Sequence, residues 1–243
     1  MRTGLFLNER QRDRFIRELM DNYLIFEKQI YSVLSSDSET DALDFQNNRL
    51  LGNREAFFDD HYQNCSDEED YFIAIESEVY RYYTFLNDAK YRTLAMWICC
   101  TCQLWEQQIL SFLCQEISNM DLLGSEKKDC FMKRYKNLSS WKYVTQLLND
   151  CNINIAGMDC SGKIDEMRLL VNVLKHSEGK SEDKLREKNP DIFLIDGKDL
   201  LPMHHTSLGY PVLNLSIDNL KEYNEALIEF WENIPVNQWL IKC

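Results

Sequence analysis

The pattern of apolar and polar positions is helical along most of this chain. Apolar residues recur three and four positions apart in 9–34, 71–86 and 216–234, as in amphipathic helices that bury one side. The stretch 91–117 contains a segment, 94–100, that is apolar all round, which is typical of a buried helix. We therefore predict an all-α fold, a multi-helix up-and-down bundle.

Turn-forming residues are rare, which also favours long helices. The 243 residues include 8 glycines and 4 prolines. The region 191–215 differs in kind, because the apolar runs 192–195 and 212–215 are separated by Asp196-Gly197, a turn signal. We expect a small β or extended insertion there, and shorter helices over 125–138 and 140–149.

We interpret residues 1–243 as a single helical domain. Residues 1–70 are expected to form an N-terminal helix and an acidic connector that extend it, and 71–243 the bundle core. The acidic run 67–70 lacks the alternating spacing and the glycine of a calcium loop, so a solvated, acidic helix start is the favoured interpretation.

The stretch from Asp165 to Gly179 is a helix with two chemically different sides, and Gly179 is expected to end it. The apolar side carries Met167, Leu170, Val171 and Leu174. The polar side, an arc of roughly 100°, carries Arg168, Asn172, Lys175 and His176. Arginine, asparagine and histidine step by four along the helix, so they form one row.

This row has the residue types that metal-independent RNA cleavage needs. Histidine titrates near neutral pH and transfers protons, and arginine donates to phosphate oxygens. An asparagine amide can orient the histidine or donate to the phosphate. At 1.5 Å per residue the row from Arg168 to His176 spans about 12 Å. The structural alternative is that the row only stabilises the helix end, with Arg168 paired to Glu106 or Asp165.

The pattern Asn172-x-x-Lys175-His176-Ser177-x-Gly179, late in a helical chain, resembles the signature helix of the HEPN superfamily. The helix with Trp105-Glu106 resembles the first core helix of these domains. HEPN domains are helical bundles, many of them metal-independent ribonucleases of toxin and phage-defence systems. One departure concerns the arginine of the family motif: Val171 directly precedes Asn172, and seven residues lie between Arg168 and His176, one more than is usual.

The resemblance implies a ribonuclease with catalytic Arg168, Asn172 and His176, supported by Glu106, that uses no metal or cofactor. It further implies a homodimer in which two copies of this helix face each other. We expect an effector of bacterial antiviral defence or of a toxin system. The alternative is a HEPN-like binding or assembly module without catalysis, or an antitoxin-like partner of a protein encoded alongside.

The net charge of the chain indicates which kinds of partner it can bind. The net charge of −13 argues against broad, nonspecific binding to nucleic acid, DNA included, and against an anionic membrane surface. A local basic stretch over 127–142 could still steer RNA, or could be a solvated face that balances the connector. The expected RNA-binding residues are Lys175, Lys133, Arg134 and Lys136. An acidic chain also suits covering a basic protein partner.

The cysteines and histidines give no metal-binding pattern. Nine cysteines, an odd number, lie mostly in apolar helical runs without a secretory signal, so we expect the reducing cytoplasm. A helix places the cysteines of Cys99-Cys100-x-Cys102 on different sides, and His204-His205 lacks further ligands. The chain has no glycine-rich phosphate loop, no G-x-S-x-G, no H-E-x-x-H and no apolar membrane span.

Overall fold

A computed structural model describes residues 6–34, 40, 41, 44, 48, 68–119, 141–150 and 153–236 of the chain. Its helical elements are α1 (Glu9–Ile25), the π-helix η1 (Phe26–Tyr31), α2 (Ser32–Leu34), α5 (Glu68–Asn119), α7 (Trp141–Asp150), the 3₁₀-helix η4 (Ile155–Gly157), α8 (Ser161–His176), α9 (Lys180–Lys188), the 3₁₀-helix η5 (Pro190–Phe193), α10 (Leu201–His204) and α11 (Ile217–Asn233). The strands are β1 (Leu194–Ile195) and β2 (Lys198–Asp199). The all-α prediction with a small insertion is confirmed.

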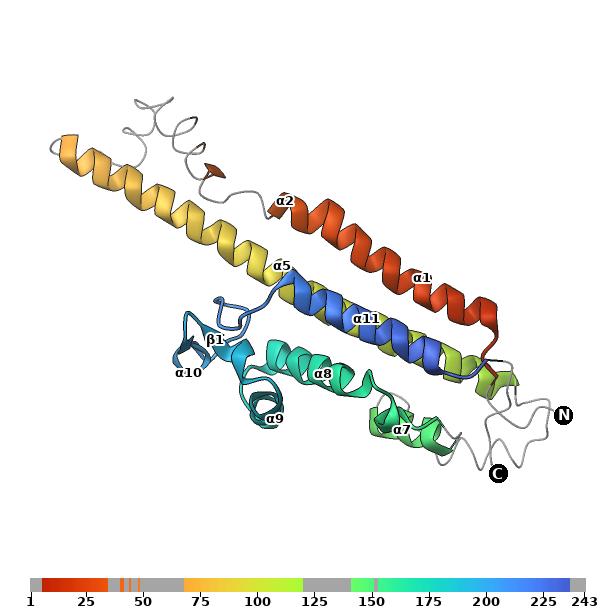
Figure 1. The fold of residues 1–243 in the computed structure, drawn as a ribbon. Helices are drawn as coiled ribbons and strands as arrows, with labels where there is room; N and C mark the ends of the chain where they lie inside the picture. The colour runs from red at the N-terminus through yellow and green to blue at the C-terminus, as the bar shows by residue number, and fades with distance from the viewer. Residues whose placement is uncertain are drawn as a thin grey trace.

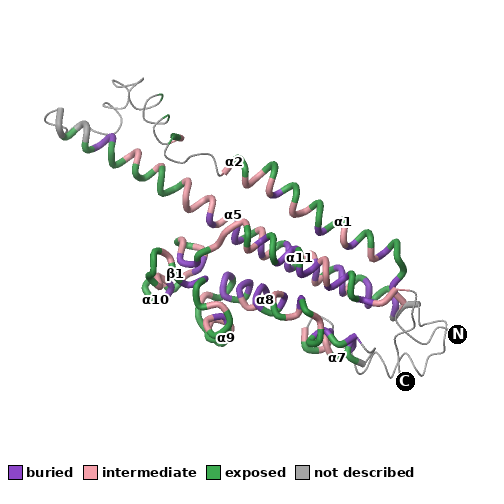
Figure 2. The backbone as a smooth tube through the Cα atoms, viewed as in Figure 1, coloured by how far each residue is buried: buried purple, intermediate pink, exposed green. Residues whose placement is uncertain are grey.

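Helix α11 is packed against three others: α1, α5 and α8 (Figure 1). Helix α5 also contacts α1 and α8 directly, and α9 packs on α8. The N-terminal part of α5, orange in Figure 1, extends beyond α8 and α11. Buried positions line α8, α11 and the part of α5 beside them, which places the core between these helices (Figure 2).

Aromatic side chains from three helices fill this core. Trp231 of α11 lies 4.5 Å from Phe15 of α1 and 6.2 Å from Phe112 of α5, measured between ring centroids. The buried Gln108 of α5 accepts a hydrogen bond from Trp231 Nε1 (2.9 Å) and donates to the carbonyl of Phe15 (3.0 Å). One amide therefore satisfies buried polar groups on both neighbouring helices, and α1 is a full member of the bundle.

Helix α5 is continuous where the sequence predicts two helices. The predicted ranges 71–86 and 91–117 leave a break at 87–90, but neither glycine nor proline interrupts the chain there. Asp88 instead accepts from Arg92 one turn later (3.0 Å), a pair that supports the helix. The prediction of a break was wrong because polar residues alone do not end a helix.

Side-chain caps fix two helix starts. Asn8 Oδ1 accepts from the N–H of Gln11 at the start of α1 (2.9 Å). Of the two residues whose side chains suit a cap for the last helix, Ser216 and Asp218, it is Ser216 that caps α11. Its hydroxyl accepts from the N–H of Asn219 (3.3 Å), and Asn219 Oδ1 accepts from the N–H of Ser216.

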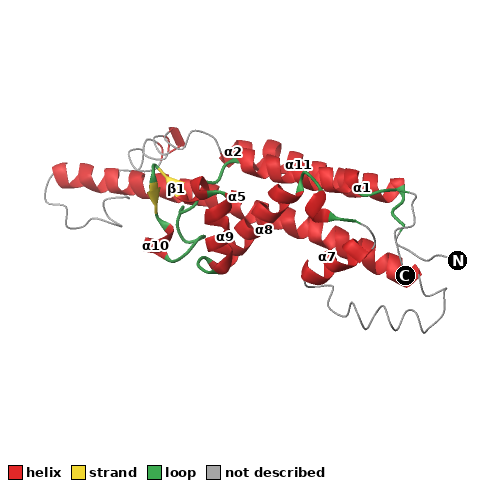
Figure 3. Ribbon diagram, turned by 60° about the horizontal axis from the view of Figure 1, so that its bottom comes forward, coloured by secondary structure: helices red, strands yellow, loops and turns green. Residues whose placement is uncertain are grey.

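The insertion is a minimal hairpin. Leu194 pairs with Asp199 and Ile195 with Lys198 in antiparallel register, joined by Asp196-Gly197 with φ of 50° and 74°. Positive φ at both turn positions is the I′ geometry that suits a two-residue hairpin, so the turn prediction is confirmed. The hairpin is small beside the helices (Figure 3). The second apolar run, 212–215, forms no strand; Val212 and Leu213 are buried instead.

None of the helices in the described ranges contains a stretch long and apolar enough to cross a membrane.

Candidate functional site at the end of helix α8

Helix α8 has the two sides that its sequence predicts. The apolar side chains, Met167, Leu170, Val171 and Leu174, are all buried against the bundle. Asn172, Lys175 and His176 are exposed on the opposite side. The polar face of α8 is therefore open to a large ligand, while its apolar face is fixed by the core.

Arg168 lies in the same row, about two helical turns before His176, and its side chain contacts two groups. Its Nε donates to Glu106 Oε1 of α5 (3.1 Å), and its Cζ lies 4.3 Å from the ring centroid of Trp141 of α7. The side chains of Arg168 and Glu106 are 23% and 35% exposed, so the pair sits at the edge of the bundle. Of the two partners that the sequence suggests for Arg168, Glu106 and Asp165, the structure shows the pair with Glu106. The contact with Trp141 could not be found from spacing within α8.

Cys102 of α5 lies within reach of the same charges. The pKa of its thiol is raised to about 12, first by burial and then by the Glu106 carboxylate, against the lowering effects of Arg168 and Lys175. Two cations and one carboxylate thus influence the pKa of this thiol, which lies between α5 and α8. The thiol stays protonated at neutral pH, which removes it as a nucleophile.

The C-terminus of α8 ends differently from the prediction. The helix stops at His176, and Ser177, with φ 62° and ψ −95°, turns the chain. Gly179, expected to end α8, is instead the residue that precedes α9, with φ 133° and ψ −166°. A conformation of this kind is nearly restricted to glycine, so Gly179 sets the direction of α9 rather than the end of α8.

The loop that follows α10 packs onto this end of α8. The buried Ser207 donates its hydroxyl to the carbonyls of Val173 and Leu174 (2.8 and 2.9 Å) and its N–H to Ser177 Oγ (3.1 Å). Tyr91 of α5 donates to the Ser207 carbonyl (2.6 Å). The carbonyl of Val173 also accepts from the N–H of Ser177 (2.7 Å), so Ser207 adds a second donor there and supplies one to Leu174. Together these bonds tie the loop to two helices.

The adjacent histidines of this loop have different partners. His204 stacks on Tyr210, with ring centroids 4.5 Å apart. His205 Nδ1 lies 2.8 Å from Glu178 Oε1, just past the end of α8. Within the part of the chain that the structure describes, no three His, Cys, Asp or Glu side chains are grouped so that they could hold a metal ion. The pairing of His205 with Glu178 was not predicted, because the two residues lie on separate loops.

The structure separates the predicted site residues into groups. Asn172, Lys175 and His176 share the exposed end of α8, while Arg168 lies two turns earlier, about 12 Å along the helix. One phosphate therefore cannot contact both Arg168 and His176 of a single copy without a large rearrangement. The predicted RNA-binding residues Lys133, Arg134 and Lys136 lie outside the described residues.

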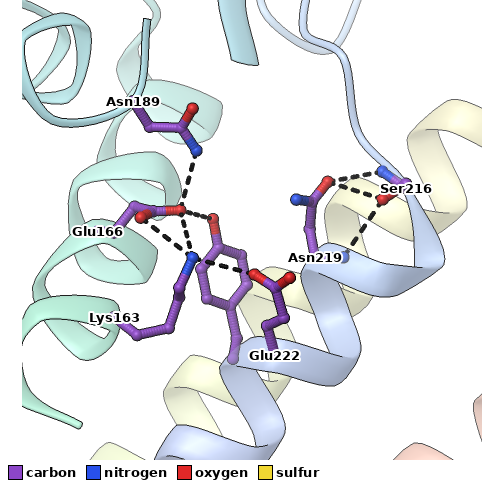
Figure 4. Close-up of polar contacts among 7 residues, drawn as sticks. Lys163, Glu166, Asn189, Ser216, Asn219 and Glu222 are labelled. Atoms are coloured by element: carbon purple, nitrogen blue, oxygen red, sulfur yellow. Dashed lines mark hydrogen bonds and ion pairs between the residues drawn. The ribbon is translucent and has the colours of Figure 1, made fainter. Parts of the chain in front are cut away.

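The N-terminal half of α8 carries a buried carboxylate, Glu166, that the sequence analysis missed. It accepts from Tyr223 of α11 (2.9 Å), from Asn189 after α9 (3.1 Å) and from Lys163 (3.3 Å) (Figure 4). Lys163 also lies 3.0 Å from Glu222. Burial and the Glu166 charge raise the pKa of the Tyr223 hydroxyl, so it stays a donor. A carboxylate with all its partners in place fastens α8 to α11 and to the end of α9.

Comparisons of the chain with models of protein families, with curated proteins and with solved structures give no match. A functional assignment must therefore rest on the geometry and chemistry of the site.

Proposed function

We propose that this chain is a HEPN-like, metal-independent endoribonuclease whose site lies on the polar face of α8. One observation carries the proposal: Asn172, Lys175 and His176 are exposed together at the end of a helix whose other side is buried. Among the described residues this face combines a proton-transfer group, a cation and an amide on the two last turns of one rigid helix. The proposal extends to an effector role in bacterial antiviral defence or in a toxin system, within the cytoplasm.

The chemistry is transesterification by the RNA itself. The 2′-oxygen attacks the adjacent phosphorus, the bond to the 5′-oxygen breaks, and a 2′,3′-cyclic phosphate and a 5′-hydroxyl result. His176 transfers the proton, as histidine does near neutral pH. Lys175 stabilises the negative charge that develops on the phosphate, and Asn172 orients the phosphate or the imidazole.

The role of Arg168 requires a second copy of the chain. Its guanidinium is oriented through Nε by Glu106 and stacked on Trp141, and within the described part of the chain these two contacts leave its terminal nitrogens available to an anion. Because Arg168 lies about 12 Å from His176 along α8, we place the active site across a homodimer. In this arrangement each site takes His176 from one α8 and Arg168 from the facing α8.

This arrangement is tested by mixing two inactive variants. His176→Ala and Arg168→Ala should each lower RNA cleavage by about 10²-fold or more. In an equimolar mixture after subunit exchange, half of the dimers are mixed, and one of the two sites in a mixed dimer is intact. The mixture should recover about a quarter of wild-type activity. Cleavage that stays at the level of the single variants would contradict a shared site.

A second candidate function is a binding or assembly module without catalysis, such as the neutralising partner of a basic toxin encoded alongside. The ion pair of Arg168 with Glu106 favours it, because the carboxylate neutralises the cation that catalysis would use. The net charge of −13 also suits a basic partner. An intact RNA substrate together with tight, salt-sensitive binding of a basic protein would select this function over the ribonuclease.

A further inference from the structure

Two residues with unusual backbone geometry belong to segments that meet at the end of α8. Among the described residues, the non-glycine residues with positive φ are Ser177, Asp196 and His205. The positive φ of Asp196 is explained by its place in the hairpin turn. His205 ends the short α10 in a left-handed conformation that glycine or asparagine usually takes. Ser177 has ψ −95°, outside the left-handed region altogether. Strained residues of this kind cluster at functional sites.

The two strained residues belong to one set of contacts. Ser207, two residues after His205, donates its N–H to Ser177 Oγ. Glu178, the next residue after Ser177, pairs with His205. The buried Ser207 hydroxyl and the Tyr91 bond hold this corner on the bundle. The strain is thus maintained by interactions whose result is to place His205 at the end of α8.

The contact with Glu178 places a second imidazole, that of His205, next to the segment that directly follows His176. Glu178, its partner, lies two residues from His176, so their Cα atoms are at most about 7 Å apart. With Nδ1 committed to the carboxylate, Nε2 is the ring nitrogen left for a ligand, and 70% of the side chain is exposed. A carboxylate that fixes one ring nitrogen and presents the other is the arrangement found in proton-transfer dyads.

We propose that His205, oriented by Glu178, is a second catalytic residue that acts with His176 on an RNA phosphodiester. This inference rests on the proposed ribonuclease function. His176 takes the proton of the 2′-hydroxyl as its oxygen bonds to phosphorus. His205 gives a proton to the 5′-oxygen as the bond from that oxygen to phosphorus breaks. Glu178 is a positioning residue that holds the imidazole of His205 in place.

The neighbouring His204 provides a matched control. It lies on the same loop, but its ring stacks on Tyr210 instead of pairing with a carboxylate. Each histidine can be replaced by asparagine, which tolerates the left-handed backbone at position 205 and transfers no proton. The set of variants is therefore His205→Asn, His204→Asn, Glu178→Gln and His176→Ala, in the full chain.

The experiment compares two leaving groups on one RNA oligonucleotide. After the cleaved linkage has been mapped, a second oligonucleotide carries sulfur in place of its 5′-oxygen, because a thiolate leaves without a proton. His205→Asn should lower kcat/KM on the oxygen substrate by about 10²-fold or more, and leave the sulfur substrate nearly unchanged. Glu178→Gln should show a smaller loss in the same pattern, His204→Asn none, and His176→Ala a loss on both substrates.

The outcomes separate this inference from the proposed function. If wild type cleaves, His176→Ala is inactive and His205→Asn equals wild type on the oxygen substrate, the role of His205 is wrong and the ribonuclease stands. Equal losses of His205→Asn on both substrates would also overturn the general-acid role, since a structural defect does not depend on the leaving group. If wild type cleaves no RNA, both proposals are wrong.

Discussion

The two ends of helix α8 use polar residues in opposite ways. At the N-terminal half, Glu166 is buried and accepts from Lys163, Asn189 and Tyr223. At the C-terminal end, Asn172, Lys175 and His176 are exposed on a face that the core does not cover. One helix of 16 residues thus carries a structural polar network and a candidate chemical site about two turns apart.

The difference between the two ends separates polar residues that serve packing from polar residues that are candidates for function. A buried carboxylate must have its partners, and Glu166 has them on three elements, so its role is explained by packing. The exposed row needs no partners for stability. Next to this row stand Ser177 and His205, two residues whose strained backbone costs stability instead of adding to it.

The largest effect on stability is expected at Glu166. Glu166→Ala leaves the buried hydroxyl of Tyr223 and the amide of Asn189 without an acceptor and should lower the free energy of unfolding by about 2–3 kcal/mol. Denaturant unfolding measures it. The control is Asp165→Ala, an exposed neighbour on the same helix, which should stay within about 0.5 kcal/mol of wild type. Equal effects of the two variants would contradict a structural role for the network.

A smaller effect is expected at Gly179. Its φ of 133° is open almost only to glycine, so Gly179→Ala should cost about 1–3 kcal/mol of unfolding free energy. Gly162 is the matched control, because it lies in the first turn of α8 and an added Cβ meets nothing within 4 Å. Gly162→Ala should stabilise by about 0.5–1 kcal/mol. Thermal unfolding of both variants measures the difference, and the same sign for both would contradict this account of the corner.

The sequence pattern predicts those parts of the fold that depend on residues close together along the chain. The two sides of α8 follow from the 3.6-residue period, and the hairpin turn follows from Asp196-Gly197. The continuity of α5 was missed because the apolar pattern was assigned to two separate ranges, 71–86 and 91–117, whereas one helix covers both. The end of α8 was assigned to Gly179 because glycine often follows a helix, whereas Ser177 turns the chain with help from Ser207.

Long-range partners could not be predicted from the sequence. The stack of Arg168 on Trp141 and the pairing of His205 with Glu178 join residues 27 apart in sequence. The bond between Glu166 and Tyr223 joins residues 57 apart. No spacing rule within one element encodes such pairs, because they arise when separate helices and loops pack together. The exposed residues of the candidate site could be named in advance, but not the groups that hold them.

The most direct test of the central claim is cleavage of a labelled RNA containing all four bases by the purified full chain, in EDTA, with His176→Ala beside wild type. The account predicts that wild type produces fragments ending in a 2′,3′-cyclic phosphate. It also predicts that His176→Ala is slower by about 10²–10⁴-fold at an unchanged unfolding temperature. RNA left intact by wild type, or cut equally by His176→Ala, would contradict the assignment of the exposed end of α8 as a ribonuclease site.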